Sequence, residues 1–248
     1  MQLPRYFVDD PLTQGSLVTL SARQGHHLLR VLRRGADAVV ELVDPRERAW
    51  SALIVRTDPK QCELEVLARV ERDAESPLRV HLAIPVLRSA RLDLAVQKAT
   101  ELGVSEIALF TSERTELSRL TPSKLEHLKA VAESAAQQSG RLRRPSIIQP
   151  RQFRDHLQAA AADRQLLFHP GSPAPDFAGT PQSVAAISGP EGGFSDVELA
   201  AASAEGWEIV GLGPRTLRAE TAPMAIATVV QAMWGDLRAR STTDQDHA

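Results

Sequence analysis

The sequence contains a single cysteine, Cys62, and therefore cannot form an internal disulfide bond. This absence suits a protein of a reducing compartment such as the cytosol. Cys62 lies in an alternating run of apolar and polar residues, which indicates a half-buried strand residue rather than a nucleophile. No apolar run reaches the roughly 18 residues of a membrane-spanning helix, and the N-terminal residues contain no apolar signal region. We therefore expect a cytoplasmic protein that is neither exported nor inserted in a membrane.

Lysine is also scarce, since only four of the 29 basic residues are lysines and the others are arginines. The net charge of −2 argues against a strongly basic nucleic-acid-binding protein. Arginine, however, presents a planar set of N–H donors that suits phosphates and base edges. A genome rich in G and C would produce the same bias, so composition leaves both explanations open. The candidate RNA-binding arginines are Arg23, Arg30, Arg33, Arg34 and Arg141.

The 248 residues are enough for two modest domains. Residues 1–72 contain short strand-like runs separated by turn residues, a pattern typical of a small β-barrel or sandwich. The polar segment 71–77 ends in proline and is the best linker candidate. Residues 73–240 alternate strands with amphipathic helices, which predicts an α/β domain. The polar tail, residues 241–248, is predicted to be disordered.

Three helix starts are predicted from their capping residues. Ser21 is a candidate N-cap for a helix that continues to Leu32 and places Leu28, Leu29 and Leu32 on one apolar face. Ser195 and Glu198 have the spacing of a capping box, so a helix should begin there. Thr221 is the predicted N-cap of the final helix.

Two glycine-rich turns each follow a predicted strand and precede a helix or a polar segment. The first, residues 189–193, reads GPEGG, and the second, residues 211–214, reads GLGP. Bare N–H groups at such turns can hold polar ligand atoms, although the glycines would also serve a tight turn without a ligand. The third glycine of a dinucleotide fingerprint and the lysine of a phosphate loop are both missing, so a nucleotide-phosphate site is not expected. Because ligands bind at the carboxyl ends of strands in open α/β sheets, we expect the two turns to share one pocket.

These turns resemble a known protein family. GPEGGFS at residues 189–195 and LGPRTLRAETA at residues 212–222 are similar to the signature pair of the RsmE family of SPOUT-type RNA methyltransferases. Further matches are QKATELG at residues 97–103, SER at residues 112–114 and QSGR at residues 138–141. The resemblance covers nearly the whole chain.

The resemblance implies a SPOUT-type knotted parallel-sheet methyltransferase domain that follows a PUA-like RNA-binding β-barrel. It implies S-adenosylmethionine (SAM) as cofactor and methylation of N3 of a uridine in the decoding region of 16S ribosomal RNA, either as naked RNA or within the assembled small subunit. It also implies a homodimer that packs around the final helix, whose apolar residues a buried position would explain equally well. Gln137 stands where we expect the family to prefer glutamate. No metal site is expected.

The cofactor of similar enzymes sits against loops at three strand ends. The residues predicted to contact SAM are Leu167, Phe168, His169, Gly189, Glu191, Gly192, Leu212, Gly213 and Leu217. The larger apolar side chains would line the adenine pocket, and the glycines would expose backbone amides to the adenine. His169 is also explained as a structural residue at the end of a strand.

Three residues are candidates for catalysis. N3 of uridine carries a proton at neutral pH, and a carboxylate such as Glu220 can remove it. An arginine such as Arg218 can stabilise the negative charge that develops on the base oxygens. Glu220 near a helix N-terminus is also favourable through the helix dipole alone, so its role as a base stays open. Arg114 follows another strand and belongs either to the same pocket or to that of a partner subunit.

Two other functions stay open from the sequence. One is the same fold with a different RNA target, such as a ribose 2′-hydroxyl. The other is a non-catalytic RNA-binding factor for ribosome assembly, which would not bind SAM.

Overall fold

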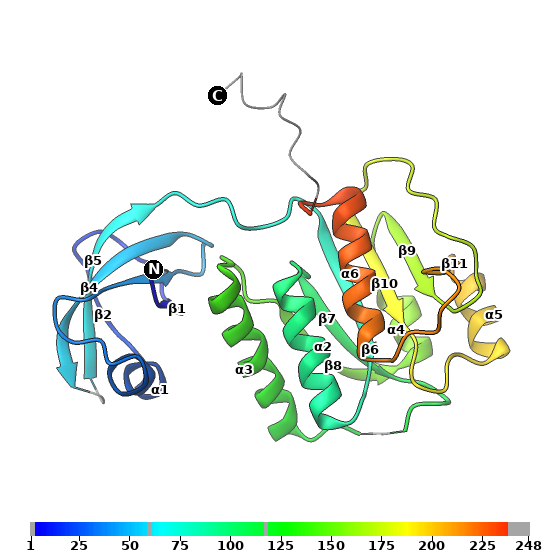
Figure 1. Ribbon diagram of the computed structural model, residues 1–248, viewed down its shortest axis with the longest axis horizontal. Coiled ribbons are helices and arrows are strands. Elements are labelled where there is room, and N and C mark those ends of the chain that lie inside the picture. The colour runs from blue at the N-terminus through cyan, green and yellow to red at the C-terminus, as the bar shows by residue number, and fades with distance from the viewer. Residues whose placement is uncertain (1–2, 59–60, 117–118, 238–248) are drawn as a thin grey trace. The chain divides into compact units, whose positions relative to one another are not determined.

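The computed structural model describes residues 3–58, 61–116 and 119–237 (Figure 1). The chain divides into two compact units, one of Met1–Ala74 with Ala136–Arg143 and the other of Glu75–Ala135 with Arg144–Ala248. Residues 136–143 thus join the first unit although they are distant from it in sequence. The predicted disordered tail, residues 241–248, lies outside the described residues.

The first unit is built on a five-stranded sheet of order β1-β3-β4-β5-β2. Its strands are β1 (Arg5–Phe7), β2 (Leu17–Thr19), β3 (Val39–Val43), β4 (Ala49–Asp58) and β5 (Gln61–Val70). β1 pairs with β3 in parallel, and the other pairs are antiparallel. Cys62 is fully buried in the core of this unit rather than half-buried, because its side chain points to the inner face of β5. Burial raises the pKa of its thiol, as expected for an unreactive core residue.

The helix predicted after Ser21 changes type part-way. α1 (Ala22–His26) begins with a capping box in which Ser21 Oγ accepts from the backbone N–H of Gln24 at 3.3 Å. A π-helical turn, η1 (His27–Val31), then follows. The wider turn shifts the register, so Leu28 is fully buried while Leu32 is 38% exposed. The prediction that both leucines share the buried face is therefore wrong.

The second unit is built on a six-stranded sheet of order β11-β9-β10-β6-β7-β8 in which every pair is parallel. Its strands are β6 (Arg79–Pro85), β7 (Glu106–Thr111), β8 (Ser146–Gln152), β9 (Arg164–Phe168), β10 (Ser183–Ser188) and β11 (Glu208–Val210). The central strands are apolar runs such as VAAI, as expected for strands covered on both faces. The α/β class with a parallel sheet is confirmed.

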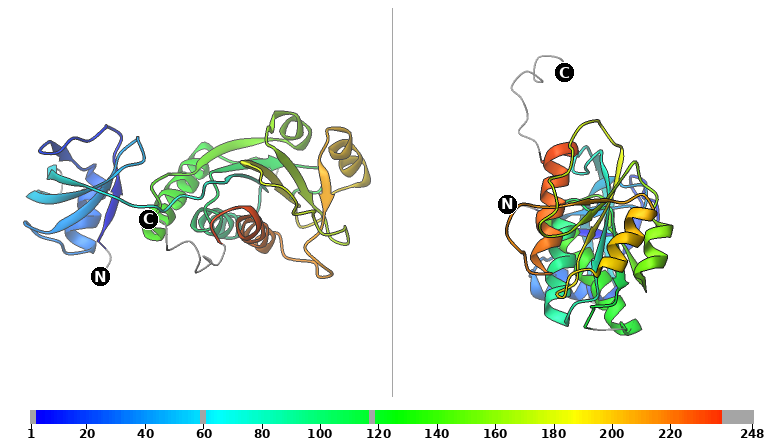
Figure 2. Two further views of the ribbon diagram at one scale, coloured as in Figure 1. Left: turned by 90° about the horizontal axis from the view of Figure 1, so that it is seen from above. Right: turned by 90° about the vertical axis from the view of Figure 1, so that its right-hand side faces the viewer.

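Helices cover both faces of this sheet. They are α2 (Ser89–Glu101), α3 (Pro122–Ser139), α4 (Phe153–Ala159), α5 (Asp196–Ala204) and α6 (Thr221–Trp234). Side chains of α2, α3 and α6 form one core with the sheet, and side chains of α4 and α5 form a second core on the opposite face. Figure 2 shows α2 and α6 on one side of the strands and α4 and α5 on the other. No helix in the described part of the chain is long and apolar enough to cross a membrane.

Two of the predicted helix starts lie beside the turns of interest. α5 begins with the predicted capping box, in which Ser195 N donates to Glu198 Oε2 at 2.9 Å. α6 begins one residue earlier than predicted, so that Glu220 rather than Thr221 is its N-cap. Glu220 already has helical backbone angles because Thr221 N and Ala222 N both donate to Arg218 O at 2.9 Å, which forms a turn before the helix.

The order of the strands indicates where on the sheet a ligand binds, namely at the carboxyl ends of the central strands. After β6 the chain builds β7 and β8 on one side, and β9, β10 and β11 then fill the other side. β6 and β10 are therefore neighbours whose connections lead in opposite directions. Ligands of open α/β sheets bind at the carboxyl ends of the strands at such a reversal.

Candidate functional site

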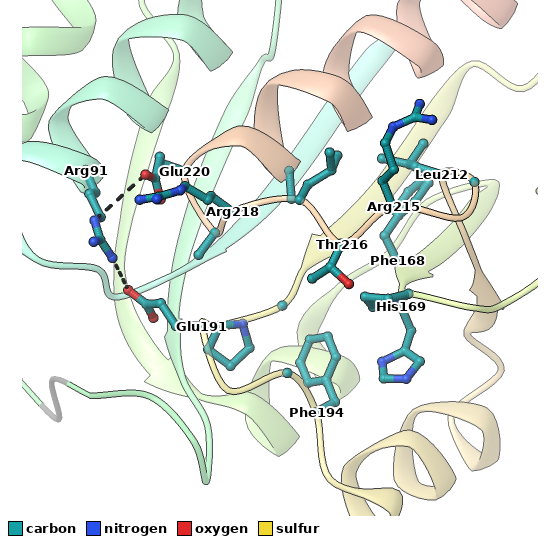
Figure 3. Close-up of a pocket in the computed structure, with 18 residues that line it drawn as sticks. Arg91, Phe168, His169, Glu191, Phe194, Leu212, Arg215, Thr216, Arg218 and Glu220 are labelled. Carbon is teal, nitrogen blue, oxygen red and sulfur yellow. Dashed lines mark ion pairs between the residues drawn. The ribbon is translucent and has the colours of Figure 1, made fainter.

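A cavity of about 340 Å³ lies at this edge of the sheet (Figure 3). Three segments and Arg91 of α2 line it. The segments are residues 168–170 at the end of β9, residues 189–194 after β10 without Gly192, and residues 212–222 after β11 without Pro214 and Thr221. β11, β9, β10 and β6 are consecutive in the sheet, so their carboxyl ends bring together segments that are far apart in sequence. The volume falls in the range of roughly 300–1,000 Å³ that is usual for ligand pockets. The two glycine-rich turns thus share one cavity.

The turn after β10 is held at both ends. Ser188 Oγ donates to Ala83 O at 3.2 Å and so attaches the end of β10 to β6. Within the turn, Gly193 has a φ of +68° and its N–H donates to Pro190 O at 2.9 Å. Phe194 then packs in the core, with its ring centroid 5.0 Å from that of Phe153. The turn is therefore fixed between a strand and a capped helix.

Gly192 was predicted to contact the cofactor, and Arg114 to belong to this pocket or to that of a partner subunit. Neither residue lines the cavity of this chain. A Cβ atom on Gly192 would lie 2.8 Å from Cβ of Arg114, and Arg114 Nη1 donates to Gly192 O at 3.0 Å. The lack of a side chain on Gly192 therefore allows the turn to approach Arg114 closely. Arg114 supports the turn from behind instead of facing the cavity.

The turn after β11 is attached to the loop after β9. His169 N donates to Val210 O at 2.8 Å, and Gly211 N donates to Pro173 O at 2.7 Å. A Cβ atom on Gly211 would overlap the carbonyl oxygen of Ser172, so only glycine allows this approach. Gly213, with a φ of +96°, then turns the chain so that the following residues line the cavity.

One end of the cavity is polar. Arg91 Nη1 lies 3.5 Å from Glu191 Oε1, and Arg91 Nε lies 3.8 Å from Glu220 Oε1. Figure 3 shows Arg91 directed toward these two carboxylates, with Arg218 at the same end. Arg91 thus joins the turn after β10 to the start of α6. Its charge also offsets the repulsion between the two carboxylates, which belong to different segments.

The rest of the cavity is largely apolar. Phe168, Leu212 and Leu217 line it as predicted, and Pro170 and Phe194 add to these walls. Leu167 does not line it, because successive side chains of a strand point to opposite faces of the sheet. Leu167 is fully buried in the core beneath α4 and α5, so its predicted contact with a cofactor is wrong.

Two polar atoms of the lining are buried without a hydrogen-bond partner among the described residues, namely Glu220 Oε2 and His169 Nδ1. Buried polar atoms are nearly always satisfied in native proteins, so each exception needs an explanation. Both residues line the cavity, and a bound molecule with polar groups would supply the missing partners. Apolar walls, exposed turn backbone and unsatisfied polar atoms together fit a cofactor such as SAM. No group of three potential metal ligands is found in the described ranges.

The candidate RNA-binding arginines lie in the first unit. Arg23, Arg30 and Arg33 are exposed around α1 and η1, and Arg34 is partly exposed. Arg141 is only 3% exposed, and its own carbonyl oxygen accepts from Arg5 Nη1 at 3.2 Å. Its guanidinium is thus not presented at the surface, which contradicts a contact with RNA phosphate.

Comparison with known proteins agrees with this arrangement. A family model described as an RNA methyltransferase domain matches residues 74–231, and one described as an RNA methyltransferase PUA domain matches residues 20–67. A ribosomal RNA small subunit methyltransferase E of Mesomycoplasma hyopneumoniae is 33% identical, over 71% of this chain and 79% of the relative. The chain belongs to the RsmE family of RNA methyltransferases. The first unit is accordingly PUA-like, as the sequence predicted.

Solved structures of similar proteins have the same fold. An RsmE-type enzyme, the ribosomal RNA small subunit methyltransferase E of Neisseria gonorrhoeae bound to S-adenosyl methionine, is 30% identical with a TM-score of 0.90. The match covers 96% of this chain and 100% of that chain. A Legionella pneumophila protein in complex with the bound cofactor SAM is 31% identical, with a TM-score of 0.89 and the same coverage.

The main lining residue that the sequence did not reveal is Arg91. It belongs to the same helix as the QKATELG match of the RsmE family, but it precedes that match. The usable signal was its position, since Arg91 stands at the start of the helix after β6. A helix start that follows a central parallel strand lies at the ligand-binding edge of the sheet. Phe194 and Thr216 also line the cavity and were not predicted.

Proposed function

We propose that this protein transfers the methyl group of SAM to N3 of a uridine in 16S ribosomal RNA. The observation that carries the proposal is the single cavity formed by the turns after β9, β10 and β11, with apolar walls and a polar end. The names of the relatives support a small-subunit ribosomal RNA substrate, and the solved neighbours with bound SAM support the cofactor. The choice of uridine N3 follows from the family resemblance of the signature residues.

The cavity offers suitable contacts for each part of the cofactor. Phe168, Leu212 and Leu217 would enclose the adenine, and backbone groups around Gly189 and Gly213 would bind its polar edge. SAM, when bound, supplies a methyl group on a positively charged sulfur and is left as a neutral thioether. Glu191 and Glu220 balance the charges of Arg91 and Arg218 at the polar end, so this end does not repel such a positive charge.

The protein's own residues would activate the base. Glu220 Oε2 is a buried acceptor without a hydrogen bond, and it would take the proton from N3. Arg218 lines the same end of the cavity and would donate to a base oxygen as negative charge develops there. A donor placed in this way is worth roughly 10²- to 10³-fold in kcat. Glu220 also remains favourable at the N-terminus of α6 through the helix dipole, and the two roles are compatible.

RNA binding is assigned to residues 1–72 and methyl transfer to residues 73–240. The exposed arginines around α1 and η1, which are Arg23, Arg30 and Arg33, support a phosphate contact in the first of these domains. Arg34, which is partly exposed, is included in the same surface. For the second domain we propose the trefoil knot of SPOUT enzymes, formed by the segments around the cofactor turns. Since the substrate would be ribosomal RNA, we assign the protein to the cytoplasm.

We further propose a homodimer that forms through α6. The inner face of this helix packs on the sheet through residues such as Ile226 and Val230. Val229, which is partly buried, and Met233, which is 38% exposed, lie beside this inner face. Apolar residues that extend beyond the face packed on the sheet support burial of the helix against a second subunit.

Mass spectrometry of nucleosides tests the proposal. Small subunits from a strain that lacks this protein should be deficient in N3-methyluridine and should regain it with the purified protein and SAM. The Arg218→Ala variant should remain folded and lose this activity. A normal level of N3-methyluridine in the deletion strain would reject the assignment, and a different missing nucleoside would identify another target. Absence of SAM binding in calorimetry would instead support a ribosome-assembly factor.

A further inference from the structure

Arg91 keeps hydrogen-bonding capacity that its ion pairs do not use. The separations of 3.5 and 3.8 Å from Glu191 and Glu220 are within ion-pair range but exceed the length of a hydrogen bond. A guanidinium has five N–H donors, and none of those on Arg91 makes a hydrogen bond within the described residues. The side chain is 42% exposed. These donors are therefore available to a ligand at the polar end of the cavity.

The neighbours of Arg91 complete a pattern of donors and acceptors. Glu220 Oε2 is a buried acceptor without a partner, and Glu220 is paired to Arg91 through its other oxygen. Arg218 lines the same end of the cavity, and its guanidinium makes no hydrogen bond or ion pair with any described residue. Figure 3 shows all three side chains at this end. The site therefore presents two donors and one acceptor.

We propose that Arg91, Glu220 and Arg218 together bind the Watson–Crick edge of uracil, with each arginine donating to one carbonyl oxygen and Glu220 accepting from N3–H. This inference rests on the proposed function, and it adds a physical reason why the protein would select uracil. The uracil edge presents an acceptor, a donor and an acceptor in that order, which is the complement of donor, acceptor and donor. Cytosine presents an amino group and an unprotonated N3 instead. One arginine would then face a donor and Glu220 would face a lone pair.

The pattern also has a consequence for reactivity. When N3 of uracil loses its proton, the negative charge spreads to O2 and O4. Two arginines stabilise this charge better than one, and a donor aimed at developing charge typically contributes about 10²-fold in rate. A site whose buried polar groups match one ligand rejects a mismatched analogue by roughly 10⁴-fold, because the mismatch leaves those groups unpaired. Arg91 is thus expected to affect both the rate and the choice of base.

A double-mutant cycle between protein and RNA tests the proposal. The substrates are ribosomal RNA targets that carry uridine, 2-thiouridine, 4-thiouridine or cytidine at the methylated position, because sulfur is a weaker acceptor than oxygen. We expect Arg91→Ala to lower kcat/KM on uridine by about 10²-fold, with a far smaller change in SAM affinity in calorimetry. One of the two thio substitutions should slow the wild-type protein but have no further effect on Arg91→Ala. We expect Arg91→Lys, which keeps a charged donor, to recover part of the rate.

Arg88→Ala is the matched control. Arg88 precedes the same helix, pairs with Glu116 at 2.8 Å and does not line the cavity, so its loss should leave kcat/KM unchanged. If both thio substitutions lower kcat/KM of Arg91→Ala by the same factor as that of the wild type, Arg91 does not contact the base. The proposal is then wrong, although the methyltransferase function stands. If the wild-type protein fails to methylate the uridine target at all, the proposed function fails and the inference fails with it. Melting temperatures distinguish either result from misfolding, and Arg91→Gln provides a second variant if Arg91→Ala is unstable.

Discussion

Replacing Gly192 with alanine tests how the turn after β10 is held in place. The added Cβ atom would lie 2.8 Å from Arg114 Cβ and 3.4 Å from Arg114 O. Ordinary contacts begin at about 3.4 Å, so the turn would have to move by roughly 0.6 Å away from Arg114. Overpacking of this kind typically costs about 1–3 kcal/mol. The displaced residues, which include Glu191, line the cavity, so the cost should appear largely in cofactor binding.

If that cost falls wholly on the bound state, SAM affinity drops by roughly 5- to 150-fold. Calorimetric titration of the wild-type protein and of Gly192→Ala measures this loss directly. The clash involves Cβ of Arg114, so Arg114→Ala cannot relieve it, whereas Arg114→Gly removes the obstructing atom. We therefore expect Gly192→Ala with Arg114→Gly to bind SAM better than Gly192→Ala with Arg114→Ala.

Two outcomes would refute this reasoning. If Gly192→Ala bound SAM like the wild type, the turn would not depend on its close approach to Arg114. If both double variants bound SAM equally well, the contact between the two Cβ atoms would not be the cause. Gly35→Ala is a control, because a Cβ atom there meets nothing within 4 Å and Gly35 has no positive φ. Its SAM affinity should equal that of the wild type.

Three further changes have defined outcomes. His156 is 9% exposed among aromatic rings, and burial lowers its pKa from 6.5 to about 4. As pH falls from 6.5 toward 4 the unfolded chain takes up a proton that the folded chain does not, so the free energy of unfolding should decrease by up to about 3 kcal/mol. In urea unfolding at several pH values, the free energy of unfolding should fall more steeply with decreasing pH in the wild type than in His156→Phe, and equal slopes would contradict the prediction. Glu220→Gln should keep SAM binding in calorimetry but lose about 10²- to 10⁴-fold in single-turnover methylation, because the amide cannot accept the proton; full activity would exclude Glu220 as the base. Met233→Glu should shift the protein from dimer to monomer in sedimentation velocity, since a charge would enter the proposed apolar interface, and an unchanged dimer would place the interface elsewhere.

Local sequence signals predicted the elements of the second unit well. Strands covered on both faces appear as apolar runs, and the capping box of Ser195 and Glu198 defines the start of α5. In the first unit the three-residue strands β1 and β2 were not predicted, because they are too short to show a period. The π-helical turn η1 was also missed, because the residue pattern that predicted the helix does not distinguish it from an α-helix.

The candidate site was predicted in part. The motifs located both glycine turns and the residues Arg218 and Glu220, and all of these line the cavity except Gly192, Gly211 and Pro214. They did not distinguish residues that face the cavity from residues that hold its walls. Leu167 was assigned to the cavity, but it faces the opposite core. Arg114 was assigned either to this cavity or to that of a partner subunit, and within this chain it supports the turn.

The sequence by itself determined the class of the fold, the places where backbone must turn tightly and the chemical groups that follow the strands. These features depend on interactions between residues close in the chain, so periodicity and glycine positions are enough to reveal them. Only the tertiary structure decided that Arg91 meets Glu191 and Glu220, and that Gly192 meets Arg114. Those contacts join loops and helices that follow different strands. The distances between these loops and helices depend on the order of the strands in the sheet. No local pattern encodes that order, because it results from how all the helices and strands bury their apolar faces together.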